Sequence, residues 1–177
     1  MKRHGKSRQT APVKKEEWIK MSKKTSANAV AVWQNQIVML LPNTFSQQII
    51  KENMSNTSLE EKQWVDEMEK AVITVRTNEI EDIQNLSDDM FFNLYFHYLK
   101  RVTKSFVYRD GFRRMYQGRE LFAIQYNGEV NGIKTSYLTV FYKEGKLNYD
   151  MTFGCAQENW KKNKKIFVNI LDAMDWV

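Results

Sequence analysis

The sequence predicts an α+β fold in which helices pack on an antiparallel β-sheet. Its strand-like segments follow one another in runs and do not alternate with helices one by one. The connections between the later strands are short and contain Gly, as in antiparallel hairpins. With 177 residues, of which 42% are hydrophobic, the chain is long enough to bury a core of its own.

The first strand is predicted over residues 36–41, an apolar run that ends at Pro42. Pro lacks the N–H group that a continuing strand would need. Residues 43–57 are expected to form a loop or a short helix. Ser58 and Glu61 have the spacing of a helix capping box, so a helix is predicted over 58–71. A strand follows over 71–77, where Val and Ile alternate with Thr.

A stronger helix signal lies at residues 88–102, with Ser87 or Asn85 as the candidate N-cap. Acidic residues at 88–89 suit the positive end of the helix dipole, and basic residues at 100–101 suit its negative end. One face carries apolar side chains at helical spacing. These are Phe91, Leu94, Tyr95, Tyr98 and Val102.

A meander of antiparallel strands is predicted over residues 106–154. The strands are expected at 106–116, 118–126, 133–143 and 146–154, with turns at 127–132 and 144–146. The clearest alternation is that of Leu138, Val140 and Tyr142 with Thr139 and Phe141. A final amphipathic helix is predicted over 158–177. Its inward-facing residues are expected to be Phe167, Ile170, Leu171 and Met174.

The net charge of +6 is carried by the beginning of the chain. Residues 1–24 hold nine basic and two acidic side chains, a net charge of +7, while the remainder holds 18 basic and 19 acidic side chains. Residues 1–28 are therefore expected to form a basic, flexible tail, and residues 29–177 a single domain. An alternative start of translation at Met21 would remove most of this tail.

No secretory signal pattern follows the early charges, and the features of a transit peptide are weak. No run of about 18 apolar residues is present, so no membrane-spanning helix is predicted. The expected location is the cytoplasm if the chain is complete as given. It is the envelope or the exterior if an N-terminal signal has been removed.

The chain offers few groups for catalysis. Only two His residues, His4 and His97, and one Cys, Cys155, are present. Cys155 with His97 could form a thiol nucleophile and its base, whereas the simpler interpretation is a small, semi-buried Cys and a solvent-facing His. Asp88 and Asp89 are adjacent on a helix and point apart. Metal and nucleotide motifs are absent, so we expect a non-enzymatic protein without a metal or other cofactor. A small-ligand carrier or enzyme would need a deep polar pocket.

Residues 109–119 combine Arg with aromatic side chains, which suits either of two roles. Such a segment can grip a protein partner, or it can protect an edge strand from aggregation by its charge. Trp64, on the helix predicted over 58–71, is a further candidate for an exposed anchor. The predicted partner-binding residues are Arg109, Phe112, Arg113, Arg114, Tyr116, Arg119 and Trp64.

The order of these segments resembles the PsbP-like and DcrB-like superfamily, which also contains a Ran-GTPase-binding nuclear protein. The resemblance covers about residues 30–177. It comprises a strand ending in Leu-Pro-Asn-Thr-Phe at 41–45, the strand at 71–77, the meander at 116–153 and the closing helix. The resemblance implies an α/β/α sandwich around a central antiparallel sheet. It also implies a non-catalytic domain that binds another protein, in the setting of bacterial secretion, immunity or the envelope. The N-terminal lipidated Cys of many bacterial members is missing here, and the basic leader has no counterpart in the pattern.

The alternative function is that of a polyanion binder acting through the tail, on nucleic acid or an anionic membrane surface. Its candidate residues are Lys2, Arg3, Lys6, Arg8, Lys14 and Lys15.

Under this alternative, deleting residues 1–24 removes most of the affinity for polyanions, because the rest of the chain is nearly neutral. Titration with a heparin or DNA oligomer at several salt concentrations measures the effect. The full chain should bind with a strong salt dependence that the shortened chain lacks. A full chain without affinity at low salt would contradict the alternative.

Overall fold

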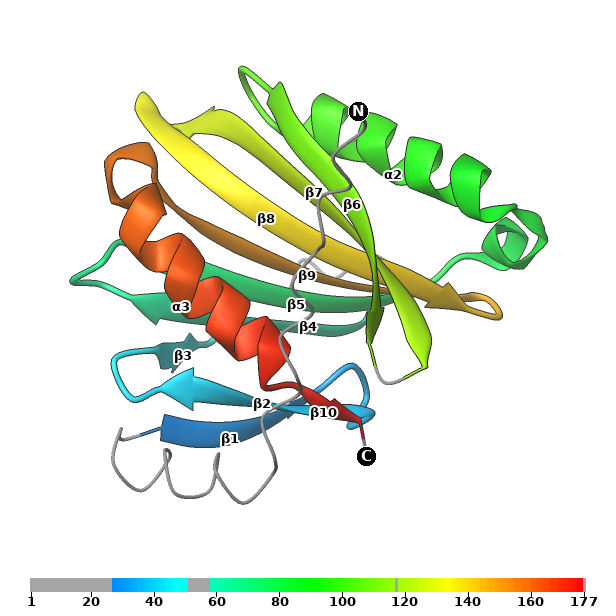
Figure 1. Ribbon diagram of the computed structural model, residues 1–177, viewed down its shortest axis with the longest axis horizontal. Helices are drawn as coiled ribbons and strands as arrows, with labels where there is room; N and C mark the ends of the chain where they lie inside the picture. Colours follow the sequence, from blue (N-terminus) through cyan, green and yellow to red (C-terminus); the bar gives the residue numbers. More distant parts are fainter. Residues whose placement is uncertain (1–26, 51–57, 117, 177) are drawn as a thin grey trace, which may run out of the picture.

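The computed structural model describes residues 27–50, 58–116 and 118–176, and it confirms the predicted α+β class (Figure 1). The strands are β1 (Ala27–Val32), β2 (Ile37–Pro42), β3 (Ser46–Gln48), β4 (Ser58–Asp66), β5 (Ala71–Glu79), β6 (Val107–Tyr116), β7 (Arg119–Val130), β8 (Ile133–Glu144), β9 (Leu147–Ala156) and β10 (Asp175–Trp176). The helices are the 3₁₀ helices η1 (Glu81–Asn85) and η2 (Gln157–Asn159) and the α-helices α2 (Asp88–Val102) and α3 (Trp160–Asp172).

Seven of these strands form one antiparallel sheet in the order β3-β4-β5-β9-β8-β7-β6. A second, three-stranded sheet has the order β1-β2-β10. The helices α2 and α3 pack on opposite faces of the large sheet, and the small sheet lies beside α3 (Figure 1). The predicted α/β/α sandwich around a central antiparallel sheet is therefore present.

The meander forms because its turns have the required backbone. Asn131 and Gly132 both have positive φ, 50° and 79°, which is the requirement of a two-residue type I′ hairpin turn. β7 accordingly continues to Val130, so the turn is shorter than the predicted 127–132. Gly145, at φ 57°, supplies the turn between β8 and β9.

The helix predicted over 58–71 is wrong, because this segment is the strand β4 and a turn. Pairing with β5 along its whole length outweighs the local capping signal. The chain then turns at Asp66, whose Oδ1 accepts hydrogen bonds from the N–H groups of Met68 and Glu69 at 3.1 Å each. The short strand β3 also lies where a loop or helix was predicted, and β1 and β10 were not predicted as strands.

The two helices are close to their predicted positions. Ser87 caps α2 by accepting a hydrogen bond from the N–H of Met90, as the sequence suggested. The buried face of α2 consists of Phe91, Tyr95 and Leu99. Leu94 and Val102 were predicted to face inward, but their side chains are 50% and 55% exposed. The face that α2 turns toward the sheet is centred nearer to Leu99 than the predicted face was.

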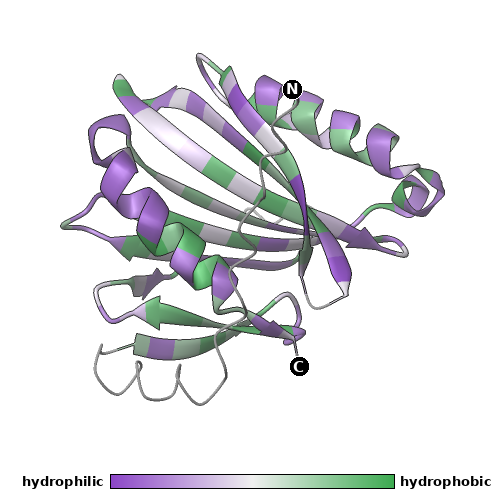
Figure 2. Cartoon of the chain, in the orientation of Figure 1, coloured by the Kyte–Doolittle hydropathy of each residue, from purple (hydrophilic) through white to green (hydrophobic). Residues whose placement is uncertain are grey.

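The final helix α3 buries the four residues predicted to face inward, although Met174 follows its last turn. The helix ends at Asp172, where the chain continues into β10 and pairs with β2. Figure 2 shows that its first turns are hydrophilic and that hydrophobic residues follow further along.

The centre of the sheet is closely packed at Gly154. This residue of β9 lies opposite Tyr137 of β8, and a Cβ atom at Gly154 would be 2.9 Å from the Tyr137 ring. That distance is too short for a carbon–carbon contact, so any side chain here displaces the ring.

We therefore expect Gly154→Ala to lower the free energy of unfolding by about 1–3 kcal/mol, measured by urea denaturation. In a Tyr137→Ala background the same substitution should have a smaller effect, because the clash is gone. Equal effects in both backgrounds would show that the ring contact is not the cause.

Candidate protein-binding edge

The strand β6 forms one edge of the large sheet and pairs only with β7 among the described strands. Eight of its ten residues are exposed. Four of the exposed side chains are apolar or aromatic: Val107 (48%), Tyr108 (47%), Phe112 (41%) and Met115 (63%). The prediction of an edge strand in this segment is confirmed, and the edge carries an unusual amount of exposed apolar surface.

Both helices hold β6 in place. On the α2 side, the ring of Phe96 lies 5.6 Å from the ring of Tyr108. On the α3 side, the Tyr116 hydroxyl donates to the backbone oxygen of Met174, and the backbone oxygen of Asp172 lies 3.2 Å from the same hydroxyl. Burial, and to a lesser extent the nearby Asp172 and Asp175 carboxylates, raise the pKa of Tyr116 to about 12, so this donor is retained at neutral pH. Contacts from both helices thus hold the edge strand in position.

The arginines of β6 do not gather in one patch. Arg113 points to the α2 side, where it pairs with Asp89 and lies 5.0 Å from the centre of the Phe122 ring. Arg114 points to the α3 side, where its Nη1 lies 2.6 Å from Oδ1 of Asp172. Arg113 therefore links β6 to α2, and Arg114 links β6 to α3.

Arg109 is the extra residue of a bulge in β6 and contacts Asn127 of β7, which lies opposite Val107. With the amide oxygen of Asn127 turned toward the guanidinium, it accepts two hydrogen bonds from Arg109, at 2.9 and 3.0 Å. Like Arg113 and Arg114, this side chain remains partly exposed and has donors to spare.

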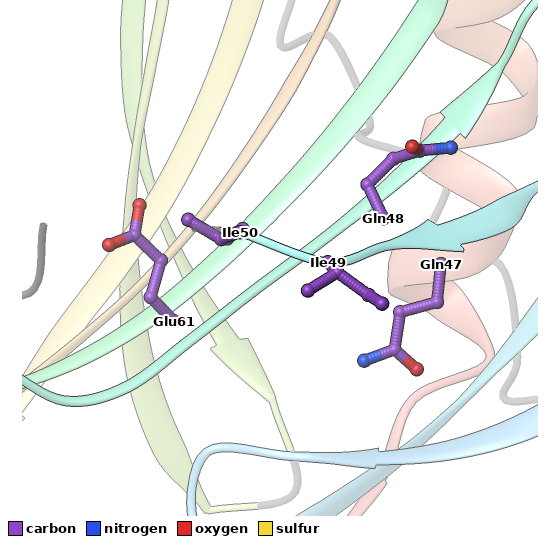
Figure 3. A pocket seen from close by; sticks show the side chains of 5 residues that line it. All are labelled: Gln47, Gln48, Ile49, Ile50 and Glu61. Carbon is purple, nitrogen blue, oxygen red and sulfur yellow. The ribbon is translucent and has the colours of Figure 1, made fainter. Parts of the chain in front are cut away.

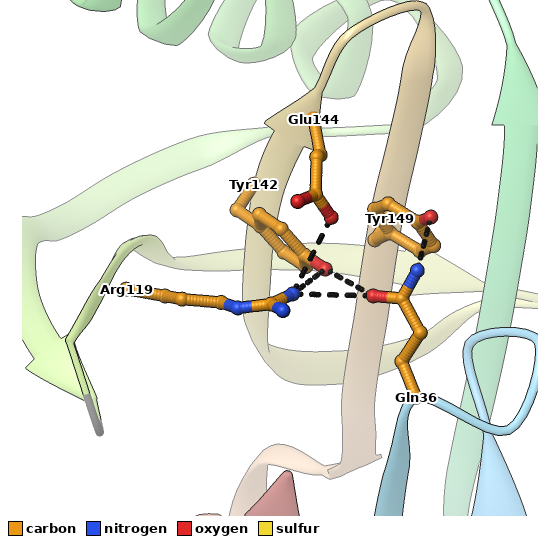
Figure 4. A network of polar contacts seen from close by, with 5 residues as sticks. All are labelled: Gln36, Arg119, Tyr142, Glu144 and Tyr149. Atoms are coloured by element: carbon orange, nitrogen blue, oxygen red, sulfur yellow. Dashed lines mark hydrogen bonds and ion pairs between the residues drawn. The ribbon is translucent and has the colours of Figure 1, made fainter. Parts of the chain in front are cut away.

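Arg119, at the start of β7, ties the two sheets together (Figure 4). Its guanidinium carbon lies 4.1 Å from the centre of the Trp176 ring of β10. Its Nη1 donates to Oε1 of Gln36 at 3.2 Å and to the Tyr142 hydroxyl at 3.0 Å. The amide nitrogen of Gln36 in turn donates to the hydroxyl of Tyr149 at 2.8 Å. These contacts make Arg119 a structural residue more than a surface grip.

Trp64 is not available as an exposed anchor, which corrects its predicted role. It lies on β4 and not on a helix, and only 4% of its surface is exposed. Its side chain belongs to the core between the sheet and α3. Because strand residues alternate between two faces, a Trp on the inward face is buried.

A narrow apolar groove runs between β6 and α3. Its lining includes Phe112, Tyr116, Leu121, Val168, Leu171 and Met174. Of these, Phe112 extends from the groove onto the exposed edge. Neither the groove nor Met115 was predicted from the sequence, and the groove depends on where α3 lies. One signal was available: residues 107–116 have apolar side chains at both odd and even positions, unlike a strand with one solvated face.

Figure 3 shows a second, open hollow beside β3, lined by Gln47, Gln48, Ile49, Ile50 and Glu61. Ile49 is 94% exposed, and Glu61 is engaged with Arg76 at 3.3 Å. The residues next to it in sequence, 51–57, lie outside the described chain. The lining groups do not converge on a common point, so no ligand chemistry follows from them.

The groups considered for catalysis lie apart. Cys155 is buried on the α3 side of the sheet, and burial raises the pKa of its thiol to about 11, which disfavours a thiolate. His97 is exposed on α2, across the sheet. Asp88 and Asp89 are exposed, and Asp89 serves the ion pair with Arg113. Within the described part of the chain, no three His, Cys, Asp or Glu side chains are grouped as for a metal ion.

One buried acidic residue stands out on the α2 side. Asp150 of β9 is 2% exposed, and it lies beside Arg76 and Tyr95. Burial raises its pKa from 3.8 to about 6, although attraction to Arg76 and hydrogen bonding with Tyr95 act in the opposite direction. Its Oδ1 has no hydrogen-bond partner among the described residues. The group is enclosed, so its chemistry concerns stability and not a substrate.

The tail residues proposed to bind polyanions, from Lys2 to Lys15, lie outside the described residues. Among the described helices, none has both the length and the apolar character needed to cross a bilayer.

The raised pKa of Asp150 predicts how stability depends on pH. The folded protein holds the proton more tightly than the unfolded chain, so the free energy of unfolding falls as pH rises from about 4 to 6. The total loss is about 3 kcal/mol. Asp150→Asn should abolish this part of the slope in urea denaturation series at several pH values, whereas Asp88→Asn, at an exposed position, should not. An unchanged slope in Asp150→Asn would contradict the assignment.

No protein-family model matches this sequence, and no curated protein matches it. Solved structures with the same fold do exist. The cyanobacterial PsbP protein (CyanoP) from Synechocystis sp. PCC 6803 is similar with a TM-score of 0.66 and 12% identity, over 85% of this chain and 92% of CyanoP.

The Ran-binding protein Mog1p from Saccharomyces cerevisiae is similar with a TM-score of 0.55 and 11% identity, over 86% of this chain and 96% of Mog1p. The Pseudomonas aeruginosa protein PA94 is similar with a TM-score of 0.51 and 8% identity, over 82% of this chain and 94% of PA94. The expected resemblance is thus confirmed at the level of the fold: this chain has the fold that PsbP and Mog1 share.

Proposed function

We propose that this domain is a non-enzymatic module that binds another protein along the edge strand β6. The observation that carries the proposal is the exposed edge itself, ten residues long, with Phe112 and Met115 among its exposed side chains. That Mog1p, a protein of the same fold, is a Ran-binding protein supports protein binding as the general role. The identity of the partner is not carried over from it.

The edge fits capture of an extended segment as an additional strand. The outer backbone groups of β6 have no strand partner among the described residues, so they can donate to and accept from an incoming strand. Phe112 and Met115 lie on opposite faces of β6, so the incoming strand is offered an apolar contact on each face. Backbone bonds then supply affinity, and these two side chains add buried area.

The arginines give this edge its selectivity. Arg109, Arg113 and Arg114 place positive charge along β6, which discourages pairing with any strand that sets a basic side chain opposite them. Both roles predicted for this segment, protection and binding, are then served by the same side chains. The ion pairs to Asp89 and Asp172 also keep the guanidinium groups in fixed positions.

The proposal predicts that a partner can be crosslinked from β6. We expect the photoreactive residue benzoylphenylalanine, introduced in place of Met115 in the native host, to give a discrete adduct with another polypeptide. The same residue in place of Ile133 is the matched control, because Ile133 is 54% exposed but lies at the β7–β8 turn. Mass spectrometry of the adducts identifies the partner. Identical adducts from both positions, or none from Met115, would overturn the proposal.

A further inference from the structure

The edge of β6 has a sequence that complements itself. Two copies of an edge strand can pair across a two-fold axis that is perpendicular to the sheet. The two strands then run antiparallel, and the α3 face of one copy lies on the same side of the joined sheet as the α3 face of the other. One residue then lies opposite its own copy, and the residues before it lie opposite those after it. We call the residue that lies opposite its own copy the centre of the pairing. Each choice of centre fixes which residues face each other across the two strands, so the charges of the facing residues can be compared.

A centre at Phe112 gives a favourable set. Asp110 lies opposite Arg114 of the second copy, and by symmetry this pair occurs twice. Gly111 lies opposite Arg113, so the large guanidinium group meets no side chain across the axis. Phe112 lies opposite Phe112 of the second copy.

None of the neighbouring centres pairs opposite charges. Centres at Asp110, Arg113 or Arg114 place a charged residue opposite its own copy. A centre at Gly111 places Asp110 opposite Phe112, twice. Arg109 is the extra residue of a bulge in β6, so it makes no regular cross-strand pair. Opposite charges that face each other stabilise a sheet and like charges destabilise it, so among the centres from 110 to 114 the charge pattern favours the one at Phe112.

The structure places the pairing residues on one face. Phe112 and Arg114 line the groove beside α3. Asp110 is on the same face, because it lies opposite Gln125, whose side chain accepts a hydrogen bond from Lys164 of α3 at 2.9 Å. Asp110 is exposed, and its Oδ1 accepts a hydrogen bond from the N–H of Gly111 at 2.8 Å; no ion pair with a described residue neutralises its charge. Arg114 is paired with Asp172 through Nη1, and its guanidinium has further donors for Asp110 of a second copy.

The two-fold arrangement limits the assembly to two copies. Each copy uses the same edge, β6, so pairing closes after one step and leaves the opposite edge of the sheet, at β3, outside the contact.

We propose that β6 pairs antiparallel with β6 of a second copy of this chain, in the register centred on Phe112. The inference rests on the proposed function, since it uses the same edge, and it names one partner for it. A contact confined to two edge strands and their flanking side chains is small, so the dimer should depend on concentration.

Cysteine crosslinking tests the register. Phe112→Cys places a thiol opposite its own copy, and mild oxidation of the full chain should give a covalent dimer on a non-reducing gel. Met115→Cys is the matched control: Met115 is more exposed than Phe112, 63% against 41%, but in this register it does not lie opposite its own copy. The native Cys155 is only 2% exposed. Dimer formation by Phe112→Cys at least about tenfold faster than by Met115→Cys supports the register, and equal or inverted rates overturn it.

A charge test provides a second measurement. Phe112→Lys and Phe112→Glu each bring two like charges together at the axis, so sedimentation should show at least about a tenfold weaker dimer for each variant alone. An equimolar mixture should recover the dimer, because opposite charges then meet. Weakening without recovery on mixing, or a wild-type chain that remains monomeric at high concentration, overturns the inference.

The two proposals fail separately. If self-pairing fails but the crosslinker at Met115 captures a different polypeptide, the proposed function stands without this inference. If the only adduct has twice the mass of the chain, the second copy is the partner and binding of another protein is excluded.

Discussion

The constraint on which the structure depends is that the large sheet is covered on both faces. Its central strands must bury side chains on each side: Val140 of β8 enters the core on the α3 side, while Phe141, the next residue, enters the core under α2. A two-sided core of this kind leaves little room for exposed chemistry in the interior strands. Exposed side chains can then collect only on helix surfaces, turns and the edges.

The edge at β6 gains its properties from this arrangement. Because α2 and α3 each contact β6 from one side, through Phe96 and through the backbone around Asp172, the strand is held in place although one flank of it is open. The ion pairs of Arg113 and Arg114 belong to the same support. A surface that is ordered in advance loses little conformational entropy when it binds, which favours recognition by a strand edge over recognition by a loop.

Much of the fold could be predicted from residue patterns, and the failures have a common physical origin. The hairpins at 133–156 and the cap of α2 at Ser87 follow from local rules, so they were found. The strand β4 was missed because a capping-box sequence is a local signal, and pairing with β5 outweighed it. Trp64 was misplaced for that reason. The edge strand could be anticipated from its charges, whereas the groove beside it and the enclosed Asp150 depend on packing between distant segments.

The small sheet has a consequence for how the chain is made. It joins β1 and β2, from residues 27–42, to β10 at residues 175–176, and Trp33 is sealed between them by Tyr142, Tyr149 and Trp176. A ribosome synthesises residues 27–42 well before residues 175–176. The β1–β2 hairpin therefore cannot complete the small sheet, nor Trp33 its contact with Trp176, until β10 has left the ribosome. Closure of this sheet is thus a late event relative to the synthesis of its own first strands.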